Sequence, residues 1–393
     1  MSWKLLQGDV MAKLAEIETG TVQCCVTSPP YWNLRNYGID GQIGLEKTPE
    51  EYVEKMVQVF REVRRVLRDD GTVWGNWGDC YNAAGRKGHG TRIGHKQQTN
   101  RASITGADEN RPTAPGLKPK DLVGIPWRVA FALQADGWYL RSDIIWAKPN
   151  PMPESVTDRP TKAHEYIFLL SKSERYFYDA EAIKEMAVSG EDMGVLRSVV
   201  HTDGKYVAWH AKSIKDRQDA GVDSKTAGTG FRNKRTVWTI ATQPYPGAHF
   251  ATFPPKLIEP CILAGTSPRA CEICGAPWER VMEKQLIPQY ESRHGGYNAR
   301  GGPKGMVDMS KTWKPGVNLT TTTGWRPTCT CKNEGTGRCI VLDPFAGSGT
   351  TLWVAEHFGR DSIGIELSPE YCELINKRMS NRQMTLFERG ADL

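Results

Sequence analysis

The chain has 393 residues, 39% of them hydrophobic and 24% charged, a composition that excludes a disordered protein and suffices for a sizeable buried core. No stretch approaches the roughly 20 consecutive apolar residues of a membrane span, and the first residues lack the apolar run of a secretory signal, so we expect a cytoplasmic protein without a membrane partner. The net charge of +6 permits a nucleic-acid partner without requiring one.

Apolar runs at 3–9 and 22–27 predict the first two strands. A helix follows, because Thr48 can cap it, Pro49 suits its first turn, and hydrophobic residues then recur at three- and four-residue spacing as far as Leu67. We expect Gly71 to close this helix. The later elements are predicted as strands at 72–77, 138–147, 165–170, 340–343 and 362–366, and as helices at 127–134, at 350–358 and from Ser368 onward.

This alternation of strands and helices predicts an α/β sheet with crossover connections. Two segments interrupt it, and we interpret both as insertions. Segment 184–235 is polar and weakly periodic, which predicts an irregular fold, and segment 265–338 contains two close pairs of cysteines and a glycine-rich tract. A third irregular stretch, 83–120, is too long for an ordinary loop inside a compact domain, which suggests a functional loop.

A glycine-containing loop follows the strand that ends at Asp343. In VLDPFAGSGTT (341–351), Gly347 and Gly349 precede the next helix, whose free N–H groups can contact a ligand. The loop lacks the lysine of a Walker loop and the third glycine of a dinucleotide fingerprint. Because the next strand ends in Glu366, an acid suited to ribose hydroxyls, the pair Asp343 and Glu366 indicates a nucleoside ligand without a pyrophosphate. A tight turn with no ligand is the alternative for the glycine loop alone.

A second loop, TSPPYW (27–32), follows the strand at 22–27. Pro29 and Pro30 fix the backbone, so that the side chain and carbonyl of Ser28 project rigidly, and neither proline donates an N–H. The arrangement suits a planar ligand with an exocyclic amine. The carbonyl and hydroxyl can accept hydrogen bonds from the amine N–H groups while Tyr31 stacks on the ring. A strand that ends at prolines beside a core aromatic is the alternative.

Together the two loops resemble those of the amino-group DNA methyltransferases, which use S-adenosylmethionine. DPFAGSGTT matches the cofactor loop of that family and TSPPYW its catalytic loop, and the order, with the catalytic loop first, resembles the circularly permuted beta class. Segments 71–79 and 144–153 resemble core segments of the class, and Gly8–Asp9 resembles its adenine-binding motif. HFATFPPKLIEPCILAG (249–265) resembles the helix that closes over the methionine end of the cofactor.

The resemblance implies a Rossmann-like α/β methyltransferase sheet, circularly permuted, with a target-recognition insertion and a zinc-binding insertion. The implied parts are a catalytic half at 1–183, the target-recognition insertion at 184–235, a core helix region at 236–264, the cysteine-rich zinc insertion at 265–338 and a cofactor-binding half at 339–393. The implied catalytic residues are Ser28, Pro29, Pro30 and Tyr31. The implied contacts to S-adenosylmethionine are Asp9, Thr252, Phe253, Asp343, Phe345, Gly347, Gly349, Thr350 and Glu366.

The implied activity is site-specific methylation of double-stranded DNA by a bacterial or phage-encoded enzyme, with base flipping and direct attack by the amine. In this family a serine at the first loop position is associated with N4 of cytosine and an aspartate with N6 of adenine. The Ser28 hydroxyl could also donate to N3 of cytosine. We therefore expect an N4-cytosine enzyme, with an N6-adenine enzyme as the alternative, and the sequence leaves open whether a cognate restriction endonuclease is a partner.

Two close pairs of cysteines predict a structural zinc site, because a disulfide framework is not expected in a long chain without an export signal. Cys271 and Cys274 flank a knuckle, and Cys329 and Cys331 form the second pair. The second pair is more tightly spaced than usual. Free buried thiols are therefore the alternative, and Cys339 is a substitute for Cys331.

Basic residues are candidates for DNA contacts. Segment 83–120 holds eight Lys or Arg residues against two acidic ones, which favours phosphate contacts, although a solvated face is the alternative. The expected DNA-binding residues are Arg86, Lys87, Arg92 and Lys96 in this segment, and Arg232, Lys234 and Arg235 at the end of the target-recognition insertion.

Two other functions stay open. A catalytically idle, zinc-containing DNA-binding module would not need Ser28 and Glu366 with intact cofactor loops. An enzyme of the same fold could instead act on RNA or on a protein glutamine, but protein-amide enzymes carry the cofactor loop first, opposite to the order in this chain.

Overall fold

The computed structural model describes residues 3–34, 38–82, 114–186, 231–243, 253–289 and 314–380. The chain divides into two compact units, which we describe separately. The first comprises Met1–Ala182, Arg235–Glu279 and Pro327–Leu393, and the second comprises Ile183–Lys234 and Arg280–Arg326. These boundaries differ from those expected at 265 and 338. The two cysteine-bearing ends of segment 265–338 belong to the first unit, with the sheet, and only its middle, Arg280–Arg326, belongs to the second unit.

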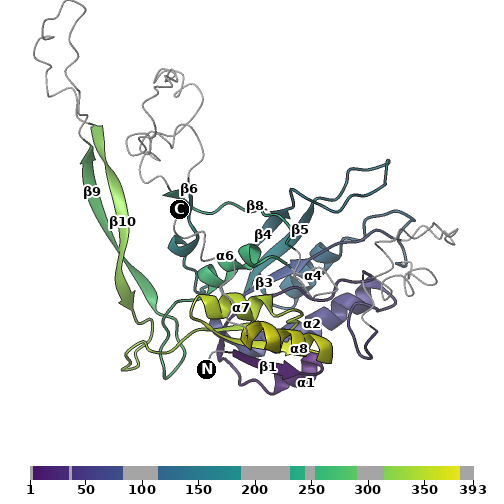
Figure 1. The fold of residues 1–393 in the computed structure, drawn as a ribbon, viewed down its shortest axis with the longest axis horizontal. Coiled ribbons are helices and arrows are strands. Elements are labelled where there is room, and N and C mark those ends of the chain that lie inside the picture. The colour runs from purple at the N-terminus through teal and green to yellow at the C-terminus, as the bar shows by residue number, and fades with distance from the viewer. Residues whose placement is uncertain are drawn as a thin grey trace, which may run out of the picture. The chain divides into compact units, whose positions relative to one another are not determined.

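The described residues of the first unit form an eight-stranded sheet with the order β1-β12-β11-β2-β3-β5-β4-β8 (Figure 1). Its strands are β1 (Trp3–Gln7), β2 (Val22–Thr27), β3 (Leu67–Trp77), β4 (Tyr139–Ala147), β5 (His164–Ser171), β8 (Val237–Thr239), β11 (Ile340–Asp343) and β12 (Asp361–Glu366). From β1 to β3 the neighbouring strands are parallel, whereas β5 is antiparallel to both β3 and β4. The strands between 3 and 171, together with β11 and β12, confirm the sequence predictions.

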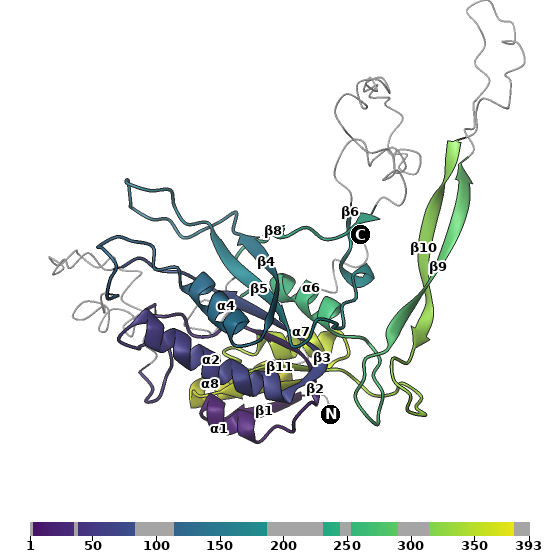
Figure 2. The same ribbon diagram turned by 180° about the vertical axis from the view of Figure 1, so that it is seen from behind.

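Helices cover both faces of this sheet, as an α/β fold requires. They are α1 (Val10–Ala15), α2 (Pro49–Val66), α4 (Ile125–Ala135), α6 (Pro255–Gly265), α7 (Thr350–His357) and α8 (Pro369–Ser380). Helices α6, α7 and α8 lie on one face and α1, α2 and α4 on the other (Figures 1 and 2). None of the helices in the described ranges is long and apolar enough to cross a membrane.

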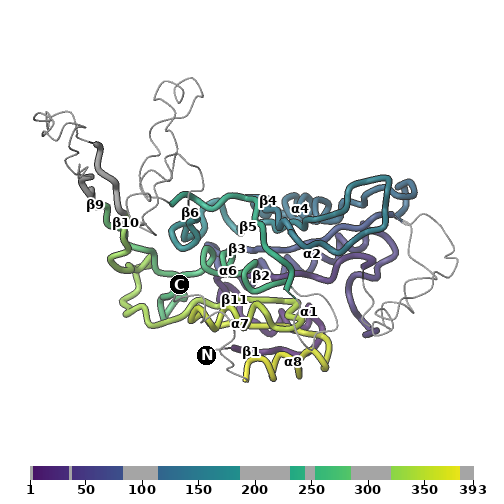
Figure 3. Tube along the Cα trace, turned by 45° about the horizontal axis from the view of Figure 1, so that its top comes forward, coloured from purple at the N-terminus to yellow at the C-terminus, as the bar shows by residue number. Residues whose placement is uncertain are grey.

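The sheet joins parts of the chain that are far apart in sequence. Strand β1 pairs with β12, and Figure 3 shows β1 beside the yellow C-terminal elements. Strand β11 pairs with β2, with Val341 opposite Cys24. Because these strands are parallel, the carboxyl ends of β2, β11 and β12 meet at one edge of the sheet, where ligands bind in open α/β sheets.

Helix α2 begins as its sequence predicts but ends earlier. The Thr48 hydroxyl accepts a hydrogen bond from the Glu51 amide (3.1 Å), so the predicted cap is confirmed. The predicted end at Gly71 is wrong, because the helix stops at Val66 and β3 starts directly at Leu67. Leu67 is buried at this junction, so its place in the hydrophobic repeat did not distinguish the last helical residue from the first residue of the strand.

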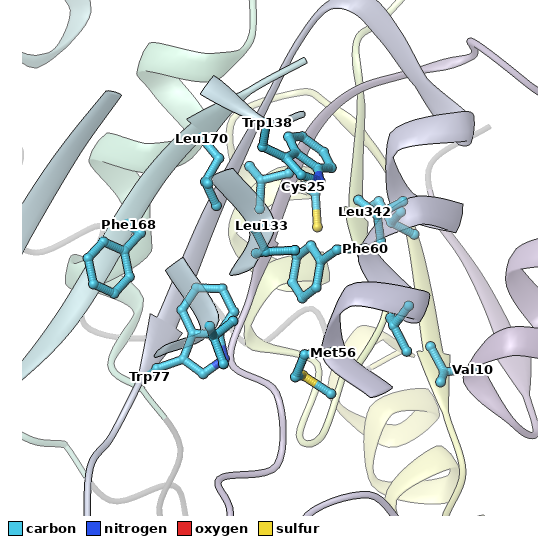
Figure 4. Packing of buried hydrophobic residues seen from close by; sticks show 14 of the residues in the cluster. Val10, Cys25, Met56, Phe60, Trp77, Leu133, Trp138, Phe168, Leu170 and Leu342 are labelled. Carbon is cyan, nitrogen blue, oxygen red and sulfur yellow. The ribbon is translucent and has the colours of Figure 1, made fainter. Parts of the chain in front are cut away.

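The main hydrophobic core lies between the sheet and helices α1, α2 and α4. Figure 4 shows Phe60, Met56 and Leu133 in this layer, and the ring centroids of Phe60 and Trp77 are 5.6 Å apart. Strands β2 and β3 therefore rest on a close-packed surface, which fixes the position of the loop that follows β2.

The second unit contains two small sheets in its described part. Strands β9 (Glu279–Gln289) and β10 (Lys314–Arg326) pair with each other, and β6 (Glu185–Met186) pairs antiparallel with β7 (Phe231–Arg232). Beside the first pair, the Arg280 guanidinium stacks on Trp325 at 4.6 Å from the ring centroid and donates to the Thr322 hydroxyl (2.8 Å). Strands β9 and β10 have no counterpart in the sequence prediction, which treated 265–338 as an insertion without assigning strands to it.

Candidate active site and cysteine cluster

A cavity of about 670 Å³ lies at the carboxyl edge of the parallel strands. Both loops that the sequence singled out line it, together with the start of α1 and the end of β12. The predicted residues on its wall are Asp9, Ser28, Pro29, Pro30, Tyr31, Phe253, Phe345, Gly347, Thr350 and Glu366. Of the other predicted cofactor contacts, Thr252 lies outside the described residues, and Asp343 and Gly349 are not on the wall.

Asp343 has a structural position that its sequence pattern did not indicate. Its carboxylate is 1% exposed and accepts from the Thr27 hydroxyl (2.7 Å), the Thr351 hydroxyl (2.7 Å) and the Phe345 amide (3.1 Å). The side chain therefore binds the end of β2, the first turn of α7 and its own loop, and it does not face the cavity. Burial raises the pKa of Asp343 to about 6, although these hydrogen bonds act in the opposite direction.

Glu366 does face the cavity and also fixes the shape of the glycine loop. One carboxylate oxygen accepts from the Gly347 amide and the other from the Ser368 amide, each at 2.8 Å. Burial raises the pKa of Glu366, and the two amide hydrogen bonds offset part of that shift. Gly347 has a φ of 52° and Gly349 a φ of 75°, a left-handed backbone that explains why glycine occupies both positions.

The TSPPYW loop is held from behind by buried aromatic residues. The Tyr52 hydroxyl of α2 donates to the Pro30 carbonyl (2.9 Å), and the Trp32 indole donates to the Glu46 carbonyl (3.0 Å). Trp32 is 1% exposed, so this aromatic of the motif belongs to the core. The loop is therefore anchored on both sides of Tyr31.

Tyr31 is more constrained than the sequence suggested. Its hydroxyl lies 2.9 Å from the Ser28 hydroxyl, 2.8 Å from Asn76 Oδ1 and 2.9 Å from Glu165 Oε2. A Cβ at Gly78 would come within 2.6 Å of the Tyr31 ring, so glycine at 78 allows the ring its position. The expected stacking of Tyr31 on a flipped base must therefore use a ring whose orientation is already fixed.

The cavity wall also includes residues that the sequence prediction did not name as site residues, among them Asn76 of β3, Lys148 just after β4, and Glu165 of β5. Lys148 forms an ion pair with Glu165, and both side chains are 17% exposed. Lys148 also lies over the Trp146 ring, 4.2 Å from its centroid. A polar residue inside an apolar strand is a signal that could have indicated Asn76, which lies between Trp74 and Trp77 in β3.

The four predicted zinc ligands come together. The Sγ atoms of Cys271, Cys274, Cys329 and Cys331 all lie within 4.8 Å of one another, whereas Cys339 is not part of this cluster and is buried. A tetrahedral zinc with bonds of about 2.3 Å separates its sulfur ligands by about 3.8 Å, so the four thiols need to close only slightly to fit that ion.

The surroundings of Cys271 also suit a thiolate. Cys271 Sγ accepts from the amides of Ile273 (3.4 Å) and Cys274 (3.5 Å), the pattern of a metal-binding knuckle. Burial opposes ionisation of Cys271, but these N–H···S contacts, together with hydrogen bonds from the Cys274 and Cys329 thiols, lower its pKa to about 7. The knuckle rests on the sheet through Gln23 of β2, whose amide donates to the Gly275 carbonyl (2.8 Å).

The predicted DNA-binding residues are only partly described. Arg86, Lys87, Arg92 and Lys96 lie outside the described residues. In the second unit, Arg232 pairs with Glu185 (3.0 Å), so its charge is already engaged, and Lys234 is half-buried. Arg235 is exposed just before β8 in the first unit.

The comparisons with known proteins agree with this arrangement of loops. Residues 22–271 and 330–377 match the sequence model of a family described as DNA methylase. Type II methyltransferase M.Cfr9I of Citrobacter freundii is 39% identical over 98% of this chain and 91% of that protein. M.SmaI of Serratia marcescens, also a type II methyltransferase, is 38% identical over 97% and 92%. The PvuII DNA methyltransferase structure, titled cytosine-N4-specific, has a TM-score of 0.51 at 16% identity over 98% and 89%, a similarity of fold.

The buried carboxylate of Asp343 predicts an unusual dependence of stability on pH. Because folding raises its pKa from 3.8 to about 6, the folded protein binds this proton more tightly, and the free energy of unfolding falls as the pH rises between these values. At about 1.4 kcal/mol per pKa unit, the loss is about 3 kcal/mol. We expect Asp343→Asn to remove this loss, because an amide does not titrate. The variant should still fold, since the Thr351 oxygen can accept a hydrogen bond from the new amide while the Thr351 hydroxyl donates to the Val26 carbonyl (3.2 Å).

The measurement is urea unfolding of the wild type and Asp343→Asn at several pH values from 4 to 7. The difference between the two proteins isolates Asp343 from the other acids. An identical slope in both proteins would contradict the prediction.

Proposed function

The chain belongs to the DNA methylase family, and we propose that it is a site-specific methyltransferase that transfers a methyl group from S-adenosylmethionine to the N4 amine of cytosine in double-stranded DNA. One observation carries this proposal: the SPPY loop after β2 and the DPFAGSG loop after β11 line a single cavity. Its finer points are the target base, the cofactor contacts, the metal and the DNA-facing residues.

The cavity wall suits S-adenosylmethionine. Glu366 offers a carboxylate for the ribose hydroxyls, and a Cβ at Gly347 would have no neighbour closer than the Phe345 carbonyl at 3.9 Å, so backbone can approach a ligand there. Asp9 and Phe253 line the same cavity and would serve the adenine and methionine ends. When bound, the cofactor supplies a methyl group on a sulfonium. Asp343 has no direct role in this proposal, because its oxygens are bonded within the chain.

The catalytic part of the proposal rests on Ser28 and the Pro29 carbonyl. A target base that has left the duplex would place its amine against these two acceptors, which favour a tetrahedral nitrogen with an exposed lone pair. Such catalysis depends on positioning and requires no covalent bond to the chain.

Cytosine is the proposed base because serine occupies the first position of the loop, the association that the family resemblance carries. The expected donation from Ser28 to cytosine N3 does not support this choice, since the Ser28 hydroxyl donates to Tyr31 (2.9 Å). An N6-adenine enzyme with the same cavity is the alternative, and the methylated product distinguishes the two.

Three further features belong to the proposal. The position of β11 and β12 at the end of the chain, beside β1 and β2, supports a circularly permuted methyltransferase sheet. Contacts of Arg235 and of the basic segment 83–120 with phosphates would supply sequence-independent affinity for DNA. A cognate restriction endonuclease would be the expected partner of a type II enzyme.

The cysteine cluster would hold one structural zinc ion. Its four thiols come from two turns, which is the closed set of ligands that a structural site uses, and direct attack by an amine requires no metal-activated water. Cys274 lies five positions before the start of β9 and Cys329 three positions after the end of β10, so the metal would join both ends of that segment.

Replacing the catalytic serine tests the mechanism and the target base together. Ser28→Ala should slow methyl transfer by about 10²–10³-fold, because a positioned hydrogen bond to the reacting group is lost, while cofactor affinity stays unchanged. Ser28→Asp should keep partial activity, since a carboxylate also accepts from the amine. The rate is measured with DNA under single-turnover conditions, and Ser142→Ala, outside the cavity, serves as the control.

Mass spectrometry of the digested DNA product should find N4-methylcytosine. A product that contains N6-methyladenine instead would show that adenine is the target base. A Ser28→Ala variant with full activity would contradict the mechanism. A protein that binds DNA but does not bind S-adenosylmethionine would be the non-catalytic module, and methylation of RNA or protein alone would replace the substrate class.

Removing the acid at the end of β12 tests the cofactor site. Glu366→Ala should weaken S-adenosylmethionine binding about tenfold or more, because a charge-assisted hydrogen bond contributes about 1.5–3 kcal/mol and each decade of affinity is about 1.4 kcal/mol. Titration calorimetry measures the affinity, with Glu370→Ala on the exposed face of α8 as the control. Unchanged affinity would remove Glu366 from the site.

The metal site predicts about one equivalent of zinc per chain by elemental analysis. Cys271→Ser should lose the metal and make the segment around β9 and β10 sensitive to protease, while the sheet of the first unit stays folded. Cys80→Ser, a cysteine outside the cluster, should change neither property. A metal-free wild-type protein with full protease resistance would refute the zinc assignment.

A further inference from the structure

A continuous chain of hydrogen bonds runs from the catalytic serine to a carboxylate. Ser28 Oγ and Tyr31 Oη are 2.9 Å apart, and Tyr31 Oη and Glu165 Oε2 are also 2.9 Å apart. Strand β5 supplies Glu165, whereas the loop after β2 supplies the other two groups. The catalytic loop is thus connected to a part of the sheet that neither sequence motif includes.

The direction of this chain is fixed by its acceptors. Asn76 Nδ2 donates to the Tyr166 carbonyl (3.1 Å), so it is Asn76 Oδ1 that faces the Tyr31 hydroxyl. Both Asn76 Oδ1 and an ionised Glu165 can only accept, and the single Tyr31 proton must therefore point toward them. Ser28 in turn donates to Tyr31, which leaves the Ser28 oxygen available to accept a proton from a substrate.

Lys148 binds the carboxylate at the end of this chain. Its ammonium group pairs with Glu165 Oε1, while Glu165 Oε2 receives the Tyr31 bond. Both partners of the ion pair are largely buried and line the cavity. A charge pair shielded from water interacts more strongly than one on the surface, so Lys148 holds the Glu165 carboxylate in position beside Tyr31.

Methylation of an amine requires such an acceptor. As the nitrogen–carbon bond forms and the sulfur–carbon bond breaks, the sulfonium becomes a thioether and the nitrogen takes the positive charge. The nitrogen must then lose one proton to give the neutral methylamine. Neither Ser28 nor a proline carbonyl can retain that proton, because neither is basic.

The geometry points to Glu165 as the acceptor of this proton, reached through Ser28 and Tyr31, with Lys148 as the residue that positions and polarises it. The amine proton passes to Ser28 Oγ, the Ser28 proton to Tyr31 Oη, and the Tyr31 proton to Glu165 Oε2. The carboxylate ends as a neutral acid, which later releases the proton to water. This inference rests on the proposed methyltransferase function and adds to it a relay that starts at the reacting amine.

Glu165→Gln keeps the size of the side chain and an acceptor atom but removes its capacity to take a proton. We expect single-turnover methylation to fall by about 10²-fold or more, the range typical of a general base, while cofactor affinity and the KM for DNA stay near wild type. Glu165→Asp should restore part of the rate. Glu62→Gln, which removes the charge of the Arg65 pair on α2 (2.7 Å), is the matched control and should keep full activity.

A structural role is distinguished by a measurement that does not depend on turnover. A 2-aminopurine at the target position reports base flipping by its fluorescence, and Glu165→Gln should leave this signal unchanged. Loss of the signal, or a Glu165→Gln rate equal to wild type, would overturn the relay. An inactive wild type that fails to methylate DNA would instead overturn the proposed function.

A double-mutant cycle tests whether the groups act as one chain. Tyr31→Phe removes the middle oxygen and keeps the ring, so it should slow the reaction about as much as Glu165→Gln. If both lie on one path, the double variant should be no slower than the slower single variant, because residues that act as a unit give non-additive losses. Multiplying losses would assign them separate roles and contradict the relay.

Discussion

The buried carboxylate of Asp343 is the interaction on which the site depends. Its hydrogen bonds reach Thr27 and Thr351, so one side chain fixes the end of β2 and the start of α7. These two hydrogen bonds hold the loop after β2 and the loop after β11 at a set separation, although Thr27 and Asp343 are 316 positions apart in the sequence. Burying the Asp343 carboxylate costs free energy of desolvation, and the hydrogen bonds that it accepts from Thr27, Thr351 and Phe345 offset much of that cost.

The loop after β2 and the loop after β11, both held by Asp343, differ in how they are made rigid. The DPFAGSG loop takes its shape from glycines with positive φ and from Glu366, which accepts a hydrogen bond from the loop amide of Gly347. The SPPY loop takes its shape from prolines and from hydrogen bonds to side chains of α2, β3 and β5. Its polar groups are consequently oriented before any ligand enters, which is the condition under which hydrogen bonds contribute most to catalysis.

Much of the fold and site could be predicted from the sequence because the signals are local. Strands, glycine turns, the Thr48 cap and the cysteine pairs each depend on neighbouring residues, and the structure confirms the α/β arrangement. What could not be predicted depends on pairing across the sheet. Glu165 reaches Tyr31 because β5 lies beside β3, and Asp343 turns away from the cavity because Thr27 and Thr351 surround it.

The pairing of β1 with β12 determines when this protein can become complete during synthesis. In the part of the chain that the structure describes, β1 lies at the edge of the sheet with β12 as its neighbour, and β11 separates β12 from β2. A ribosome adds about 5–20 residues per second, so β1 waits tens of seconds for its partner. During that time β1 and one side of β2 are exposed edges, and a nascent chain shortened before β11 has the SPPY loop but no DPFAGSG loop opposite it.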